Sequence, residues 1–306
     1  MTRGGLIFAH NGTIDYGSQA VLSARLATKH LDIPVSLVTD SVTLENIKTK
    51  FDQLPFDQII LINLPNSNNI RFLTDHSVLA ANLAMTRIGL PDNLKFKQNM
   101  LKEQISFIND SRVLAYDLTP YDQTLVFDTD FLIFSNRLNK YWDSTYDFLI
   151  SPGMLNLQEN TIAPDQYQIN DYTIDQLWAT TFIFSKTEET RIFFNLLKYI
   201  KEQYNYFAHL YNFEPRQYRN DFAFSVACHI IGGHGAEQWH GLLPCPLFFT
   251  DDDSIIDIKD NGQLTFLLGD TARLYDFLLA KSVNQDVHVM NKRNILANLD
   301  RLLELA

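Results

Sequence analysis

Short apolar runs alternate with amphipathic stretches over the first part of the chain. Residues 6–9, 35–38 and 59–62 are mainly apolar, and each run ends at polar or turn-forming residues, which is the pattern of buried strands. Residues 16–30, between the first two runs, place Ala and Leu near helical spacing. A strand, a helix and a strand at these intervals form a βαβ unit. We therefore predict a parallel sheet covered by helices.

The pattern continues to the end of the chain. It predicts further strands at residues 124–127, 148–150 and 181–184, helical structure at 112–118, 187–204, about 221–230 and near 274–278, and an amphipathic tail at 293–305. No internal repeat, low-complexity tract or linker interrupts this order. We predict a single α/β domain over residues 1–306, with a Rossmann-like, mixed and mostly parallel sheet.

The composition narrows the class of protein. Hydrophobic residues make up 46% and charged residues 20% of the 306 residues, as in an ordinary globular enzyme. The formal net charge of −11 disfavours broad binding to nucleic acid. The two cysteines indicate free thiols in a reducing compartment, and no apolar run approaches the roughly 20 residues that span a bilayer. We expect a cytoplasmic protein that is not bound to a membrane.

The strongest chemical signal is Asp128-Thr129-Asp130, directly after the apolar run 124–127. Ligands of α/β folds bind outside the carboxyl ends of the parallel strands, where these two carboxylates would lie. Mn²⁺ and Mg²⁺ prefer oxygen ligands and share them with substrate phosphates. The triplet alone is a weak signal, but the apolar residues 131–134 continue beyond it, which a solvated acidic turn rarely requires. We therefore predict a metal site formed by Asp128 and Asp130.

Three segments resemble the glycogenin-like family of retaining glycosyltransferases, which has the GT-A fold. The longest is Ser111-Arg112-Val113-Leu114-Ala115-Tyr116-Asp117-Leu118-Thr119-Pro120-Tyr121-Asp122 together with Leu125-Val126-Phe127-Asp128-Thr129-Asp130. Phe8-Ala9-His10-Asn11 with Tyr16 is similar to that family's first-strand nucleotide loop, and residues 286–292 are similar to its C-terminal His–Lys segment. Proteins of this kind also occur among phages. The segments occur in the family's order and span most of the chain.

The resemblance implies a function and a division of the chain. A sugar would move from a nucleoside diphosphate-sugar, with UDP as the expected nucleotide, to a hydroxyl acceptor of unknown class, with retention of anomeric configuration. The nucleotide-binding half would cover residues 1–135, and the sugar and acceptor half residues 136–306. Mn²⁺ or Mg²⁺ would be the cofactor.

The resemblance also implies roles for single residues. His288 would be the third metal ligand, and Asp221 would face the sugar as a catalytic residue. The predicted contacts to the nucleotide-sugar come from Ala9, Asn11, Tyr16, Asp40, Arg112, Thr129, Trp178 and Lys292. For four of these residues a purely structural role remains open: a core ring for Tyr16, a helix cap for Asp40, a surface ion pair for Arg112 and core packing for Trp178.

The sequence departs from the family on the sugar and acceptor side. Trp178-Ala179-Thr180 stands where the family commonly has Asn-Ser-Gly, and Phe222 follows Asp221 where the family has Gln. The segment 286–292 lacks the family's Gly and Pro-Trp. The nucleotide half of the donor site is therefore better supported than the sugar or the acceptor.

Other interpretations are weaker but stay open. A zinc site of His229, His234, His240, Cys228 and Cys245 lacks the expected ligand spacing. We expect Asp251-Asp252-Asp253 to be a solvated turn. The alternative functions are a sugar nucleotidyltransferase, a phage enzyme that glycosylates a hydroxylated DNA base, and a nucleotide-binding protein without turnover. The absence of Gly-x-Gly-x-x-Gly and Walker-type loops argues against dinucleotide oxidoreductases and P-loop kinases.

Overall fold

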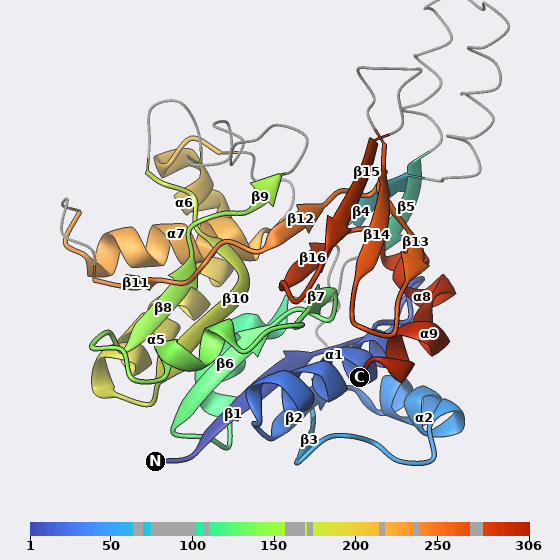
Figure 1. The fold of residues 1–306 in the computed structure, drawn as a ribbon. Helices are drawn as coiled ribbons and strands as arrows, with labels where there is room; N and C mark the ends of the chain where they lie inside the picture. The colour runs from blue at the N-terminus through green and yellow to red at the C-terminus, as the bar shows by residue number, and fades with distance from the viewer. Residues whose placement is uncertain are drawn as a thin grey trace, which may run out of the picture.

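The structure is a computed structural model, and it describes residues 1–63, 70–74, 102–106, 110–156, 169, 174–213, 218–234, 239–269 and 278–306. Its centre is a seven-stranded sheet with the strand order β11-β8-β10-β6-β1-β2-β3 (Figure 1). The strands are β1 (Arg3–Phe8), β2 (Val35–Thr39), β3 (Ile59–Leu61), β6 (Gln123–Phe127), β8 (Phe148–Ser151), β10 (Trp178–Ser185) and β11 (Gly241–Leu242). β10 runs antiparallel to both of its neighbours, and the other pairings are parallel. The predicted mixed, mostly parallel sheet is confirmed.

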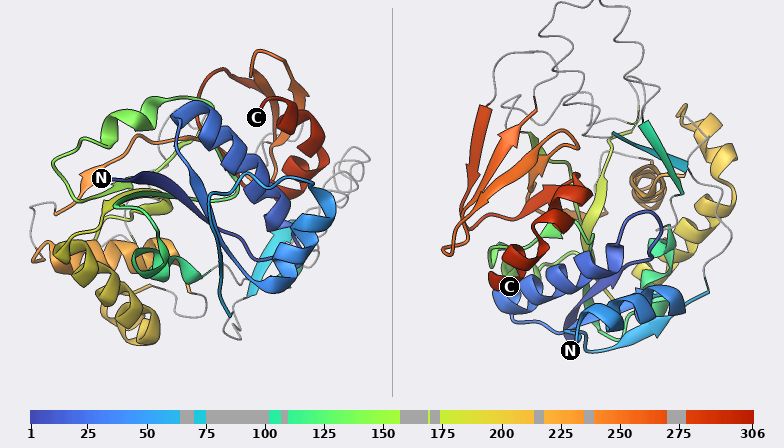
Figure 2. Two further views of the ribbon diagram at one scale, coloured as in Figure 1. Left: turned by 90° about the horizontal axis from the view of Figure 1, so that it is seen from below. Right: turned by 90° about the vertical axis from the view of Figure 1, so that its right-hand side faces the viewer.

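Helices cover both faces of this sheet because alternate strand residues are apolar on each side. Ile7 and Leu125 face α1 (Tyr16–Leu31), whereas Leu6 and Val126 face α5 (Glu188–Glu202) and α7 (Asn220–Ile231). Figure 2 shows α1 and α5 on opposite sides of the strands. The short helices α2 (Ser41–Lys50), α4 (Ala115–Leu118) and α6 (Tyr204–Leu210) and the 3-10 turns η2 (Ser111–Leu114) and η3 (Arg137–Tyr141) complete these layers.

A second sheet joins distant parts of the chain. Its order is β7-β16-β12-β9, from β7 (Phe131–Leu132), β16 (Val287–Val289), β12 (Leu247–Phe249) and β9 (Leu155–Asn156). β16 is antiparallel to β7, and His288 is the register partner of Phe131. The pairing therefore fixes the C-terminal segment beside the loop that follows β6.

Two smaller sheets complete the fold. β13 (Ser254–Ile258), β14 (Leu264–Leu268) and β15 (Leu278–Ser282) form an antiparallel sheet, and β4 (Ile70–Thr74) pairs with β5 (Lys102–Ser106). The helix predicted near residues 274–278 is wrong at Leu278, which begins β15; residues 271–277 lie outside the described residues.

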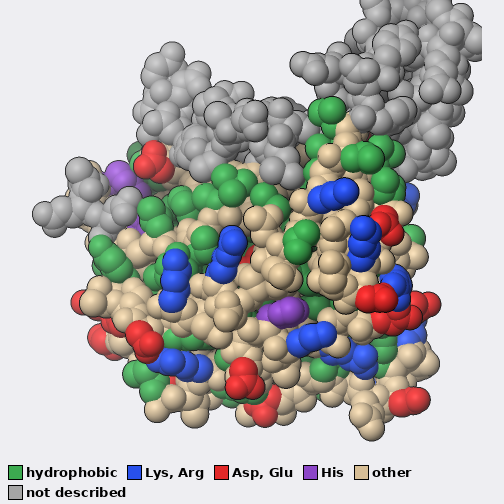
Figure 3. Space-filling view, viewed as in Figure 1, with side chains coloured by type: hydrophobic (Ala, Val, Ile, Leu, Met, Phe, Trp, Pro, Cys, Tyr) green, Lys and Arg blue, Asp and Glu red, His purple; other side chains and the backbone are tan. Residues whose placement is uncertain are grey.

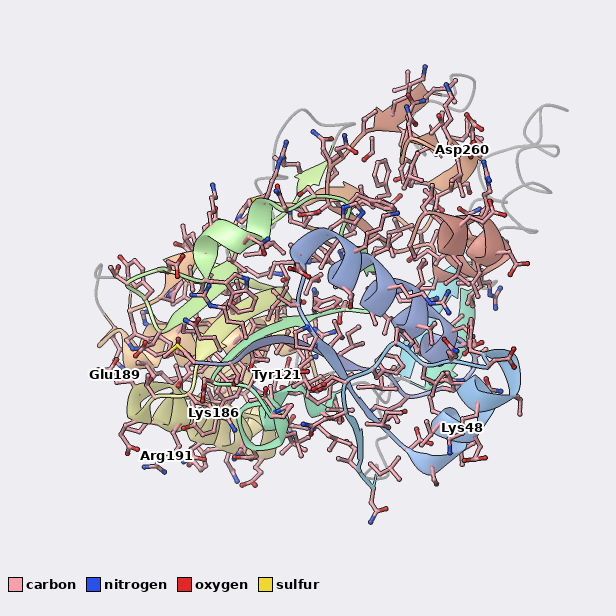
Figure 4. The ribbon with its side chains drawn as sticks, turned by 60° about the horizontal axis from the view of Figure 1, so that its bottom comes forward. Lys48, Tyr121, Lys186, Glu189, Arg191 and Asp260 are labelled. Carbon is pink, nitrogen blue, oxygen red and sulfur yellow. The ribbon has the colours of Figure 1, made fainter. Side chains whose placement is uncertain are left out.

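The predicted amphipathic tail is confirmed as α8 (Lys292–Ala297) and α9 (Leu299–Glu304). Leu302 is fully buried, and the Nζ of Lys29 on α1 donates to the carbonyl oxygen of Leu305 (2.7 Å). Figure 4 illustrates the contrast between core and surface: Tyr121 lies inside the molecule, whereas Lys48 on α2 and Asp260 beyond β13 lie at its edges. None of the described helices is both long and apolar enough to cross a membrane.

Candidate functional site

The loop that follows β6 brings three metal-ligand side chains together. Asp128, Asp130 and His288 each offer a ligand atom, and these atoms lie within 4.8 Å of one another. The amide of Asp128 donates to the carbonyl oxygen of Thr180 on β10 (3.0 Å), and the amide of Val289 donates to that of Asp130 (3.0 Å). Backbone bonds to two different strands thus hold the loop. The structure therefore brings the three predicted ligand residues together, and their binding of a metal stays a prediction.

Asp130 lies at the centre of a buried charge cluster. Its Oδ2 is 2.6 Å from Nζ of Lys292, and its Oδ1 is 3.3 Å from Nε2 of His288. Burial by itself raises the pKa of the Asp130 carboxyl, but the neighbouring ammonium of Lys292 and the hydrogen bond from the imidazole of His288 more than offset this effect and hold the pKa far below its usual range. Burial likewise lowers the pKa of Lys292, and Asp130 reverses the shift, so the net pKa of Lys292 is raised. Both groups stay ionised at neutral pH.

Asp128 is paired with a second cation. Arg112, on the 3-10 turn η2, forms an ion pair with Oδ1 of Asp128. Its Nη1 donates to the carbonyl oxygen of Ala179 at the start of β10 (2.9 Å). Each of the two acidic metal-ligand candidates therefore has its own cation.

The donor chemistry of the cluster fits a hard divalent cation. Carboxylate oxygens are preferred by Mg²⁺ and Mn²⁺, and a neutral imidazole is a further ligand that Mn²⁺ accepts. His288 is 3% exposed and its Nδ1 has no hydrogen-bond partner among the described residues, so Nε2 is the ring nitrogen that faces the carboxylates. Asp128, Asp130 and His288 would hold the ion.

Thr129 is turned away from this cluster. It is 4% exposed, its hydroxyl donates to Oε1 of Gln19 on α1 (3.2 Å), and its carbonyl oxygen accepts from the hydroxyl of Ser23 (2.7 Å). Thr129, predicted to contact the nucleotide-sugar, is thus bound to α1 through its side chain and its carbonyl group.

Trp178 stands beside the metal ligands. Its ring centroid is 6.2 Å from that of His288 and 6.3 Å from that of Phe248, both in edge-to-face orientation. The pairing of β10 with β8 shifts register between Trp178 and Phe182. Trp178 and Phe248 are both only partly buried. The position is compatible with stacking on a ligand and also with packing around His288.

Asp221 is tied into the same region by hydrogen bonds. Its Oδ1 accepts from the amide of Ala179 (3.0 Å), and its Oδ2 accepts from Nη2 of Arg219 (3.2 Å). Arg112 binds the carbonyl group of the same Ala179. Phe222, which stands in place of the family's amide, packs on Phe213 (4.9 Å between ring centroids) and under the guanidinium of Arg219.

The loop after β1 uses its polar groups locally. The side-chain oxygen of Asn11 accepts from the amide of Gly17 (2.8 Å), and Ala9 is fully buried with its carbonyl accepting from Thr39. Tyr16 begins α1, is 9% exposed and packs in the apolar cluster between α1 and the central sheet. This position fits the alternative of a core ring.

Asp40 caps a helix that the sequence did not predict. Its Oδ1 accepts from the amides of Val42 and Thr43 (2.9 Å each) at the start of α2, and its Oδ2 accepts from the hydroxyl of Thr43. Oδ2 also lies 3.2 Å from Nδ1 of the buried His10. The helix-cap alternative accounts for both oxygens.

The rival acidic and zinc groups take other roles. Asp253 is 2% exposed, so the predicted solvated turn is wrong for this residue. Its carboxylate accepts from the amides of Thr250 and Gly269 and so connects these two positions of the chain. Asp251 lies close enough to raise the pKa of Lys292. Within the described part of the chain, the histidines and cysteines of the zinc interpretation do not converge on a three-ligand group.

Sequence reasoning missed Gln19 and Ser23. Both are fully buried on one face of α1 and bond to Thr129. The available signal was the polar set Ser18, Gln19 and Ser23 within an otherwise apolar helix stripe.

Comparisons with known proteins add little. The chain matches no family model and no curated protein. It is similar to the crystal structure of the galactosyltransferase LgtC in complex with donor and acceptor sugar analogs (16% identity, 80% of this chain and 75% of that one, TM-score 0.44). It is also similar to the glycosyltransferase GlyE of Streptococcus pneumoniae TIGR4 (9% identity, 79% of this chain, TM-score 0.42), of which it spans about half the length, 46%. At these identities and TM-scores, neither similarity identifies the family or activity of this chain.

Proposed function

We propose that this protein is a metal-dependent glycosyltransferase of the GT-A class that uses a nucleoside diphosphate-sugar, with UDP as the nucleotide. One observation carries the proposal: two carboxylates and an imidazole converge with two cations, Arg112 and Lys292, at the carboxyl ends of parallel strands. Carboxylates and imidazole suit a divalent ion, whereas a guanidinium and an ammonium suit phosphate oxygens. A bound metal–diphosphate pair needs both sets of groups in one place.

The side chains have distinct tasks in this proposal. Asp130 keeps Lys292 protonated, so that an ammonium is available to a phosphate group that carries the developing negative charge. Arg112 would direct its guanidinium, which suits phosphate oxygens, from a position fixed by Ala179. A bound Mn²⁺ or Mg²⁺ would supply Lewis-acid stabilisation of the leaving diphosphate. Trp178 would stack on the sugar or the base, and the nucleotide would lie on the half formed by residues 1–135.

Asp221 takes a positioning role in this scheme. Its two oxygens hold the amide of Ala179 and the guanidinium of Arg219, and Ala179 in turn holds Arg112. Asp221 would therefore keep the cations oriented around the sugar, and a retaining reaction would need one of these bonds to open. The acceptor is a hydroxyl group, and a hydroxylated DNA base is one candidate for it.

Thermal unfolding with added nucleotides tests the donor class. UDP with Mn²⁺ should raise the melting temperature, because a ligand that binds the folded state stabilises it by about 2.7 kcal/mol at a hundredfold excess over its dissociation constant. UDP with EDTA should give a much smaller rise. Mn²⁺-dependent release of UDP from a UDP-sugar would then establish turnover.

The variant Lys292→Met separates the phosphate contact from the metal contact, because it removes the ammonium but keeps the length of the side chain. It should weaken UDP binding more than Mn²⁺ binding, because the ammonium is assigned to phosphate. A dinucleotide that raises the melting temperature when UDP does not would overturn the proposal. Tight UDP binding without turnover of any UDP-sugar would instead favour a binding protein.

A further inference from the structure

Gln19 is a fully buried amide on α1, a helix whose buried residues are mostly apolar. It is 0% exposed on α1, between fully buried neighbours such as Ala20, Leu22 and Ala24. Burying an amide costs about 1–3 kcal/mol unless hydrogen bonds satisfy it. A leucine or methionine would fill this space at lower cost, so packing alone does not explain a glutamine here.

The amide connects two segments that lie far apart in the sequence. Its Oε1 accepts from the hydroxyl of Thr129 (3.2 Å), and its Nε2 donates to the carbonyl oxygen of Lys292 (3.2 Å). A carbonyl oxygen can only accept, so the NH₂ group must face Lys292 and the oxygen must face Thr129. The chemistry of the partners therefore fixes the orientation of the amide.

Both partners of Gln19 adjoin the charge cluster. Thr129 lies between Asp128 and Asp130, and Lys292 forms the 2.6 Å ion pair with Asp130. Ser23, one turn further along α1, holds the carbonyl group of Thr129 (2.7 Å). Helix α1 thus holds residues 128–130, the metal loop, through Gln19 and Ser23, and it holds the segment 288–292 through Gln19.

We propose that Gln19 is a positioning residue that keeps the metal loop 128–130 and the segment 288–292 in mutual register. It acts through the hydroxyl of Thr129 and the backbone carbonyl of Lys292. The link to metal and diphosphate binding rests on the proposed function. The link between the two segments rests only on the contacts of Gln19.

The test compares Gln19→Met with Ser18→Ala. Methionine has nearly the same length but lacks both hydrogen-bonding groups. Ser18 is the matched control because it is 1% exposed on the same helix and its hydroxyl donates only to Asp15. Mn²⁺ affinity is measured by calorimetry, and amide hydrogen exchange is followed in peptides that cover residues 286–292, including the amide of Val289 that bonds to Asp130.

We expect Gln19→Met to bind Mn²⁺ about tenfold more weakly, which is at the low end for loss of an outer-shell partner. We also expect faster exchange in residues 286–292, whereas Ser18→Ala should change neither quantity. Thr129→Val should reproduce much of the loss of affinity, and the double variant should lose less than the sum, because both residues act through one contact.

A lowered melting temperature with unchanged Mn²⁺ affinity and unchanged local exchange would overturn the proposal and leave Gln19 a structural core residue. If the wild-type protein binds neither Mn²⁺ nor UDP, the proposed function is overturned instead. The exchange measurement alone then decides whether Gln19 holds the two segments together.

Discussion

The residues of the charge cluster are paired so closely that binding and stability depend on the same side chains. The side chain of Asp130 is 5% exposed and that of its partner Lys292 10%, whereas the side chain of Asp128 is 20% exposed. A buried ion pair contributes little net stability when complete, but removal of one partner leaves an uncompensated charge in the interior. The two aspartates of the motif should therefore respond differently to substitution.

Asp130→Asn should lower the free energy of unfolding by about 3 kcal/mol, because it leaves the buried ammonium of Lys292 without a counter-charge. Asp128→Asn should cost less, since Arg112 keeps its bond to Ala179 and the side chain of Asp128 is 20% exposed, against 5% for Asp130. Both variants should lose Mn²⁺ binding. Urea denaturation and Mn²⁺ titration measure the two effects. Equal stability of the two variants would show that the Asp130–Lys292 pair is not formed in solution.

At the scale of elements, the sequence predicted what depends on local patterns. The strands β1, β2, β3 and β6 and the helix α1 are correct because apolar periodicity reports burial directly. The helix α2 was missed because only Thr43, Leu44 and Ile47 of its residues are buried, which leaves a weak stripe. The sheet β13–β15 was missed although Asn261-Gly262 between β13 and β14 is a strong hairpin signal.

The assembly of the site could not be obtained from local patterns. His288 reaches Asp130 because β16 pairs with β7, and no periodicity encodes a pairing between such distant segments. Only the family resemblance placed His288 and Lys292 with the metal loop. Gln19 had no such support, because polar residues on a helix, here Ser18, Gln19 and Ser23, are usually exposed, and only the structure shows that Gln19 is 0% exposed.

The start of α2 provides a test of the role of Asp40. Asp40→Ala should lower the free energy of unfolding by about 1 kcal/mol through loss of the cap on Val42 and Thr43. It also removes one hydrogen-bond partner of the buried His10, so we expect the loss to be somewhat larger than that of an isolated cap. Asp40→Asn keeps an acceptor oxygen for the two amides and should recover most of the stability. UDP affinity of the folded protein should not change in either variant. A weakened UDP affinity at unchanged stability would instead assign Asp40 to the nucleotide.

At the scale of the whole molecule, the net charge and its distribution over the surface bear on whether DNA is the acceptor. The formal net charge is −11, and Figure 3 shows acidic and basic side chains interspersed over the described part of one face, without a continuous basic stripe there. DNA-binding enzymes neutralise several phosphates with Lys and Arg side chains, and affinity falls steeply with salt for that reason. The side chains of Arg112 and Lys292 at the centre of the site are only 11% and 10% exposed, so they do not add to a basic surface for a DNA backbone.

We therefore expect that double-stranded DNA carrying hydroxymethylated bases does not bind at physiological salt, with any dissociation constant weaker than about 10⁻⁴ M, the weak end of non-specific binding. Fluorescence anisotropy of a labelled duplex, measured with and without UDP and Mn²⁺, checks this expectation. An unmodified duplex of the same sequence is the matched control. If affinity is micromolar or tighter, depends on the hydroxymethyl group and falls with added salt, a DNA base becomes the favoured acceptor. The DNA-base alternative would be removed if the duplex does not bind and the protein transfers sugar, with Mn²⁺, to a carbohydrate or another small hydroxyl compound. In that case the acidic surface keeps polyphosphate backbones away, while the internal cations still attract a single diphosphate.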